Sequence, residues 1–579
     1  MARPPLMRTG LAYHPQRGCN GPMTETPITS HFAAPLYASP TMRALMSDRA
    51  RLQRMLDVEA ALARAEAAVG VISATGANAI AQACNAAHYD IASLIEAQAP
   101  SGDIAGAMVA ALTQYVATSN PAAANFVHWG ASSQDIIDTA LMLDLRAAID
   151  AMISDIDLAI KGFTTLAGRH RRTLSVARSA MQHALPMPFG LKLAGYAAAL
   201  GRSRERLTRL RREALALQFG GTAGTLAVLG EHGLAVSERM AALLDLSMPD
   251  APWHAHRDRL AEVAGCFGIL AGTCGKIARD VKLMMQTEVG EASARHKGNP
   301  ADAALSAATV APNLVATLLA AQVQEHERAP DGWHTDWITF PALILVTSGA
   351  LAGVVAMAQG LEIDVERLRQ NLDLTGGQIM AEAVSYALGG RIGRAQAHVL
   401  VEELSGRAAR DKGSLKEALL NDTRVRSHLS VAEIEKLFIP LTYQGSAQIF
   451  IDRLVVASQM RAPRRTEPRA ESRPEPPAES RPEKHPVEAM LAGASAPAMT
   501  DRPDFAKPPM AASDQVAALS PTAAGTAEVP NLQPAPAAAL PAQAAPEKLQ
   551  WPGTLLHIFT NAAKPSGGPP SNRDKSDLP

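Results

Sequence analysis

Apolar residues recur at spacings of three and four between Arg257 and Met285, with polar residues between them. The apolar positions are Leu260, Val263, Phe267, Leu270, Cys274, Ile277, Val281 and Met284. This heptad spacing predicts one helix, about 40 Å long, that packs lengthwise against other long helices. We expect the seam to need partners beyond the core of one chain, which favours an oligomer. Charged clusters flank the stretch, so we expect binding or catalytic sites at the ends of the long helices.

The same spacing, in segments rich in alanine and leucine, predicts helices along the rest of the folded region. Expected helices include one across 52–65, one from Ile136, one across 193–217 and one from Pro300 to Arg328. Asn299 is a suitable N-cap residue, and proline is favoured at the first helical position that follows it. No run of alternating residues predicts a strand, so the expected fold class is all-α. We expect an N-terminal helical domain at 31–112, a central long-helix bundle at 113–361 and a C-terminal helical domain at 362–456.

One segment has the length of a membrane span, because no charged residue occurs between Asp336 and Glu362. Thr347, Ser348 and Gln359 interrupt its apolar character, and it follows an amphipathic bundle pattern. We therefore favour a buried bundle helix over a membrane helix.

Composition narrows the class of protein. The 579 residues carry a net charge of −1, which argues against a partner held by bulk charge, such as nucleic acid or a membrane surface. The four cysteines form neither a disulfide framework nor a CxxC metal site, so we expect a reducing cytoplasm. Residues 1–30 contain no secretory signal and are expected to be disordered, with Met23 as an alternative start. The Pro/Ala-rich stretch 457–579 is expected to be a disordered tail.

Three polar clusters are candidates for chemistry. The turn before Ile136 contains Ser132 and Ser133, which could bind a carboxylate at a helix start or could simply cap the helix. His183 is a candidate acid or base because histidine titrates near neutrality. Lys297 and Asn299, with Arg295 and His296 nearby, suit the binding of an anion at a helix start. The glycine-rich stretch 220–225 lacks the phosphate-loop spacing and predicts a tight turn. His254 and His256 are two residues apart and would face apart on a helix, which argues against a metal site.

Several segments, in this order, resemble the fumarase/aspartase superfamily, and most closely its 3-carboxy-cis,cis-muconate cycloisomerase branch. The segments are Trp129–Asp135, Gln182–Pro186, Pro252–His254 with Arg257–Arg259, His326–Arg328, Trp333–His334 and Asn371–Gly377. The resemblance covers roughly 31–456. It implies a long-helix bundle assembled as a homotetramer, without a metal or an organic cofactor. Each active site would combine Ser132–Asp135, Arg178–His183 and the loop that ends at Asn299, each from a different subunit.

The activity implied is lactonisation of 3-carboxy-cis,cis-muconate, a small tricarboxylate of protocatechuate (β-ketoadipate) catabolism. The resemblance implies catalytic roles for His183, Lys297 and Ser293. It implies substrate-binding roles for Ser132, Ser133, Arg178, Gln182, His254, Arg257, His296 and Asn299.

Two positions depart from the superfamily pattern. The loop 290–300 keeps Lys297, Asn299 and Pro300, but it lacks the paired serines and the Met-Pro of the usual motif. Ser179-Ala180 replaces the usual Thr-His, as is common in the cycloisomerase branch. Two other hypotheses stay open. One is a lyase that releases fumarate from a succinyl adduct such as adenylosuccinate, against which Ala180 argues. The other is a helical scaffold without catalysis, which the altered loop favours.

Overall fold

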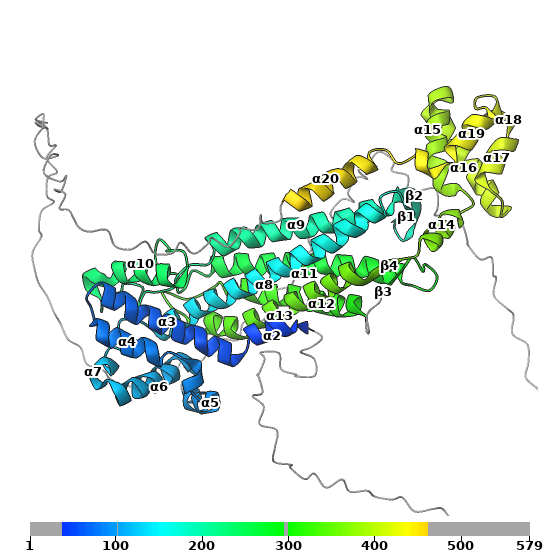
Figure 1. Cartoon of the computed structure of the whole chain (residues 1–579). Helices are drawn as coiled ribbons and strands as arrows, with labels where there is room; N and C mark the ends of the chain where they lie inside the picture. Colours follow the sequence, from blue (N-terminus) through cyan, green and yellow to red (C-terminus); the bar gives the residue numbers. More distant parts are fainter. Residues whose placement is uncertain (1–36, 101, 295–298, 461–579) are drawn as a thin grey trace, which may run out of the picture. The chain divides into compact units, whose positions relative to one another are not determined.

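The computed structural model describes residues 37–460, except for residues 101 and 295–298 (Figure 1). The expected leader, most of the expected tail, His296 and Lys297 lie outside the described residues. The described chain is mostly helical, as the sequence predicts. Its N-terminal elements are α2 (Pro40–Leu45), α3 (Asp48–Ala68), α4 (Ala74–Ala83), η1 (Ala86–His88), α5 (Ile91–Gln98), α6 (Ile104–Ser119) and α7 (Pro121–Ala124).

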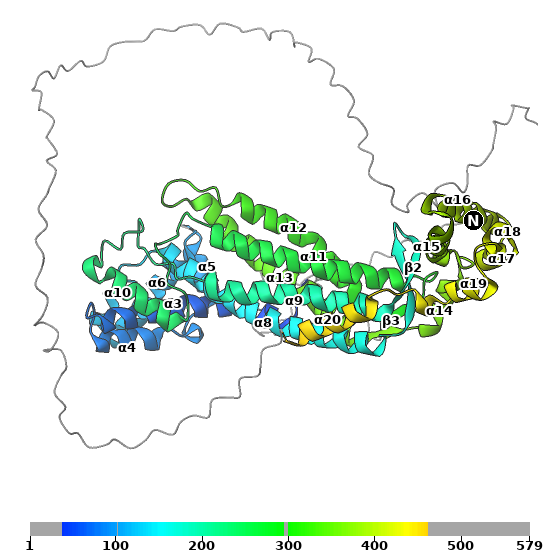
Figure 2. The same ribbon diagram turned by 90° about the horizontal axis from the view of Figure 1, so that it is seen from above.

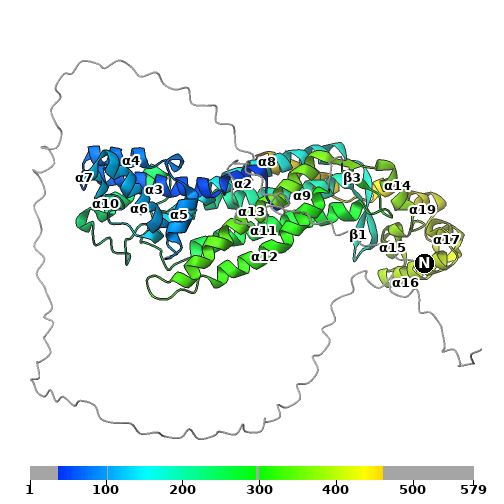
Figure 3. The same cartoon turned by 90° about the horizontal axis from the view of Figure 1, so that it is seen from below.

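Five long helices form the centre of the fold. They are α8 (Ser133–Arg169), α9 (Phe189–Glu213), α11 (Asp258–Met284), α12 (Pro300–Ala320) and α13 (Pro330–Gly360). Figures 1, 2 and 3 show them side by side, and contacts join α8 to α9 and α13, and α11 to α9, α12 and α13. The short elements η2 (Gly230–His232) and α10 (Gly233–Leu244) precede α11, and α10 packs on α3.

The predicted seam helix is confirmed as α11, and all eight of its apolar seam residues are buried. They are buried within one chain, against α9, α12 and α13. The expectation that this seam needs partner copies is therefore wrong, because neighbouring helices of the same chain already cover it.

Three described helices, α11, α12 and α13, are long and apolar enough to cross a membrane by length and composition alone. In α13, which contains the uncharged segment, 78% of the most apolar window is buried inside the fold, as expected of a bundle helix. In α12 the buried share is only 22%, so much of this apolar helix is uncovered in one chain. The helix begins at Pro300 with Asn299 as its N-cap, as predicted, but it ends at Ala320 and not at Arg328.

Two small antiparallel sheets were not predicted. One pairs β1 (Leu174–Ser179) with β2 (Gln182–Pro188), and the other pairs β3 (Ala292–Ala294) with β4 (Leu361–Ile363). The β1–β2 turn consists of Ala180 and Met181, both at positive φ (49° and 64°), which is the backbone twist that tight hairpins need. Alanine and methionine are not typical of such turns, so the sequence gives no hairpin signal.

Nine described elements follow β4, and five of the helices among them build a second hydrophobic core. The nine elements are α14 (Val365–Asp373), η3 (Gln378–Met380), α15 (Ala381–Ile392), α16 (Arg394–Arg410), α17 (Leu415–Asn421), α18 (Thr423–Arg426), α19 (Val431–Leu437), η4 (Pro440–Thr442) and α20 (Ala447–Met460). Leu388, Leu404 and Leu419 lie in this separate core. The last helix, α20, instead returns to pack on α8 and α9 of the central bundle.

Candidate active site

The turn that contains Ser132 and Ser133 caps the start of α8. The Ser132 backbone N–H and hydroxyl both donate to Asp135 Oδ2, each at 2.9 Å. The Ser133 hydroxyl donates to Asp103 Oδ2 at 2.6 Å. In one chain both serines are therefore used in local hydrogen bonds, which is the capping alternative, and carboxylate binding by them stays a prediction.

A buried network around Asp135 lies behind this turn. Asp135 accepts hydrogen bonds from the backbone N–H groups of Gly220 (3.0 Å) and Gly221 (2.9 Å), and His254 Nε2 lies 2.9 Å from its Oδ1. His254 is buried, so its ring holds Asp135 in place and does not face an open surface. The glycine-rich stretch is the tight turn that the sequence predicts. A Cβ on Gly220 would meet the His254 ring at 2.9 Å, which explains the glycine.

Arg257 lies in the core of the chain. Its guanidinium binds Asp138 at 2.5 and 3.1 Å and Asp336 at 2.7 Å, and only 3% of the residue is exposed. Trp333 Nε1 donates to the same Asp138 at 3.1 Å. Burial raises the pKa of Asp336 to about 6, although Arg257 opposes this rise. In one chain the guanidinium is thus fully used by these two carboxylates, and substrate binding by Arg257 stays a prediction.

A second group of polar residues lies at the β1–β2 hairpin. Arg178, on β1, donates two hydrogen bonds to Glu291, at 2.9 and 2.6 Å, and Asn371 Nδ2 donates to the same carboxylate at 2.8 Å. Gln182 is exposed next to the hairpin turn. His183 is half-buried, and its Nδ1 is buried without a partner among the described residues. Burial, and then the nearby Arg178 charge, hold the pKa of His183 below its usual value.

The third predicted segment is the loop 290–300, and the structure describes it on both sides of residues 295–298. Glu291 is 1% exposed and occupies a position in the loop where the superfamily pattern has serine. Ser293 is exposed on β3, opposite Glu362 on β4. Asn299 accepts a hydrogen bond from the Ala301 N–H at 3.1 Å as the N-cap of α12. No group of three His, Cys, Asp or Glu side chains among the described residues could hold a metal ion.

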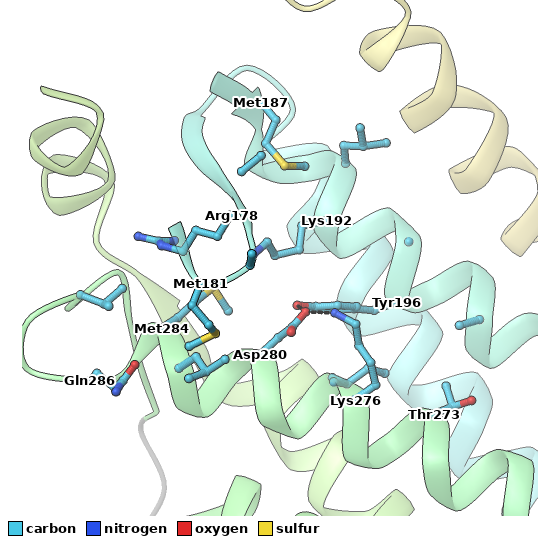
Figure 4. Close-up of a pocket in the computed structure, with 18 of the residues that line it drawn as sticks. Arg178, Met181, Met187, Lys192, Tyr196, Thr273, Lys276, Asp280, Met284 and Gln286 are labelled. Atoms are coloured by element: carbon cyan, nitrogen blue, oxygen red, sulfur yellow. Dashed lines mark hydrogen bonds and ion pairs between the residues drawn. The ribbon is translucent and has the colours of Figure 1, made fainter. Parts of the chain in front are cut away.

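A cavity of about 1050 Å³ lies between the hairpin, α9 and α11 (Figure 4). Arg178, Lys192, Tyr196, Lys276 and Asp280 are its charged and phenolic lining residues. Met181, Met187, Leu191, Ile277, Leu283 and Met284 supply most of its apolar wall. The sequence analysis did not identify Lys192, Lys276, Asp280 or Glu291. Charged residues in helices and loops are usually exposed to solvent, and nothing in the neighbouring sequence sets these four apart.

The described site residues form two groups that lie far from each other within one chain. Helix α8 has 37 residues, or about 55 Å at 1.5 Å per residue. Ser132, Ser133 and His254 lie at its start, whereas β1 follows its end (Figure 1). Arg178, Gln182, His183, Ser293 and Asn299 belong to this second group. A site that uses both groups therefore needs more than one copy of the chain.

Comparisons with known proteins agree with this architecture. A sequence model described as Lyase matches residues 36–299, and one described as Adenylosuccinate lyase C-terminus matches residues 377–454. A 3-carboxy-cis,cis-muconate cycloisomerase from Bradyrhizobium diazoefficiens is 57% identical over 440 residues, which are 74% of this chain and 98% of that protein. A nitrosuccinate lyase from Streptomyces davaonensis is 36% identical over 461 residues, which are 76% of this chain and 97% of that protein.

Among solved structures, the 3-carboxy-cis,cis-muconate lactonizing enzyme from Pseudomonas putida matches with a TM-score of 0.71 and 43% identity. The match covers 75% of this chain and 100% of that one. Sequence and structure thus agree over nearly the full length of these relatives, and the chain belongs to the fumarase/aspartase superfamily of lyases.

Proposed function

We propose that this protein is a cycloisomerase that lactonises 3-carboxy-cis,cis-muconate to 4-carboxymuconolactone. The observation that carries the proposal is the 57% identity to a cycloisomerase of that name over 98% of its length. The substrate class is a small carboxylate, and the finer assignment is a tricarboxylate of protocatechuate catabolism. We also propose a cytoplasmic location, which the four cysteines without a disulfide framework support.

The bond-forming step needs no catalytic base from the protein. One substrate carboxylate, ionised near neutrality, adds its oxygen to the carbon–carbon double bond, and a proton is delivered to the adjacent carbon. The protein must hold the other carboxylates and stabilise the enediolate-like charge that develops between these events. His183 supplies the proton in this scheme. Burial and the Arg178 charge hold its pKa below the usual value, and a carboxylate bound beside it would favour the protonated ring.

We infer that the protein acts as a homotetramer with shared sites. Two observations support this assembly. The Ser132 group and the His183 group lie about 55 Å apart along α8, and the apolar helix α12 is mostly uncovered in one chain. Light scattering at micromolar protein should give about four chains per particle. An active, stable monomer would refute the shared-site arrangement.

The function is tested by incubating the purified full-length chain with 3-carboxy-cis,cis-muconate. Loss of the ultraviolet absorbance of the diene, with the lactone identified by nuclear magnetic resonance, is the expected result. Release of fumarate from a succinyl adduct, without lactone formation, would favour the other lyase hypothesis. A folded chain that consumes neither compound would favour the scaffold hypothesis.

A further inference from the structure

Three cationic side chains line the cavity, and they differ in whether a carboxylate is paired with them. Arg178 is engaged by Glu291 through both of its terminal nitrogens. Lys276 is ion-paired with Asp280 one helical turn away, and the Tyr196 hydroxyl donates to the same carboxylate at 2.7 Å. Two of the three cations therefore have a carboxylate of their own.

Lys192 is the exception. It lines the same cavity, yet it forms no ion pair or hydrogen bond with any residue that the structure describes. Figure 4 shows it between Arg178 on one side and the Tyr196, Asp280 and Lys276 group on the other. The side chain is half-buried, and burial lowers its pKa despite the nearby carboxylates Asp280 and Glu291.

The position of Lys192 in its helix further disfavours the charged form of its side chain. It is the fourth residue of α9, in the first turn, where the helix dipole disfavours a cation. A half-buried ammonium without a counter-ion, at this end of a helix, is unfavourable unless an anion occupies the cavity. Stability of the fold therefore does not explain the residue, whereas binding of an anion does.

We propose that Lys192 binds a carboxylate of the substrate in the cavity between the hairpin, α9 and α11. The proposal rests on the proposed function for the identity of the substrate, but its chemical content is recognition of a small polycarboxylate. Arg178 is less suited to this role, because its fork is already occupied by Glu291. The cavity, at about 1050 Å³, leaves room for a tricarboxylate and for residues that a neighbouring copy contributes.

The test measures binding of propane-1,2,3-tricarboxylate to the full-length chain by calorimetry, which needs no turnover. Lys192→Met should weaken binding by about 10-fold or more, as expected when a charged hydrogen-bond donor is lost. Lys192→Arg keeps the charge and should bind within about threefold of wild type. Lys276→Met is the matched control, because it removes a cation from the same wall that is already paired with Asp280. It should change the affinity by less than about threefold.

The outcomes separate this proposal from the proposed function. If wild type does not consume 3-carboxy-cis,cis-muconate, the function fails, while the tricarboxylate titration still decides the role of Lys192. If wild type is active, Lys192→Met should also raise KM by about 10-fold or more. Equal affinity of wild type and Lys192→Met, or no tricarboxylate binding by wild type, would overturn the proposal. Circular dichroism of each variant excludes loss of fold as the cause of weakened binding.

Discussion

Replacing Glu291 by alanine should destabilise the fold, although the residue lies in a loop where the superfamily has serine. The Glu291 carboxylate is 1% exposed and accepts hydrogen bonds from Arg178, twice, and from Asn371. Glu291→Ala leaves these donors without their acceptor. Asn371 Nδ2 keeps its second bond, to the Val289 carbonyl at 2.9 Å, so most of the loss falls on Arg178.

The size of the effect follows from burial. Removing one partner of a buried ion pair costs about 3–5 kcal/mol. The Arg178 side chain is 24% exposed and can regain some hydration, so we expect the lower end, about 3 kcal/mol. With an unfolding entropy of about 2 cal/mol/K per residue over roughly 400 residues, this corresponds to a fall in Tm of about 3–4 °C.

A double-mutant cycle checks the reasoning. Thermal unfolding is measured for Glu291→Ala, Arg178→Met and the double variant. Arg178→Met leaves the buried Glu291 carboxylate with one donor, so each single change should lower the Tm. The double variant should have a Tm no lower than that of either single variant. Single losses that simply add in the double variant would show that the two side chains do not depend on each other. Glu291→Ser removes the same carboxylate and should destabilise the fold similarly, so it is a poor way to restore the superfamily loop.

Three further predictions concern other parts of the chain. Burial, and then the Glu59 charge, raise the pKa of Glu66 from 4.5 to about 8, so the folded chain binds an extra proton between these values. Stability should therefore fall as pH rises through this window, and the Tm advantage of Glu66→Gln should grow from pH 5 to pH 8.5; parallel pH profiles would contradict this. Lys297→Ala should lower kcat/KM by about 10²-fold or more, measured with 3-carboxy-cis,cis-muconate, and a change within twofold would remove Lys297 from the mechanism. Truncation after Met460 should leave Tm within about one degree of wild type, and a fall of several degrees would show that the tail packs on the bundle.

Local patterns were enough to predict the helical class of the fold and several of its long helices. The a/d spacing identified α11 because burial of one helix face is visible in a single segment of sequence. The start of α12 was likewise visible in Asn299 and Pro300, since capping involves neighbouring residues. The hairpin was missed because Ala180 and Met181 adopt positive φ without the residues that usually signal it.

The site depended on contacts between distant segments, which one sequence does not reveal. Arg257 resembled a substrate-binding arginine, but Asp138 and Asp336, each 79 or more residues away, hold it in the core. His254 was expected to bind substrate; in one chain it is buried against Asp135, and the substrate-binding role stays a prediction. The unmatched charge of Lys192 became visible only when Arg178 and Lys276 were each seen to have a carboxylate.

The length of α8 has a genetic consequence. If each catalytic centre takes the Ser132 turn from one copy and the His183 hairpin from another, a chain defective at one end still carries an intact other end. Mixing inactive Ser133→Ala chains with inactive His183→Ala chains, followed by reassembly, would then give some centres in which both contributions are wild type. Random mixing in equal amounts would restore about a quarter of the centres. Two recessive alleles of this gene could thus complement each other within one protein.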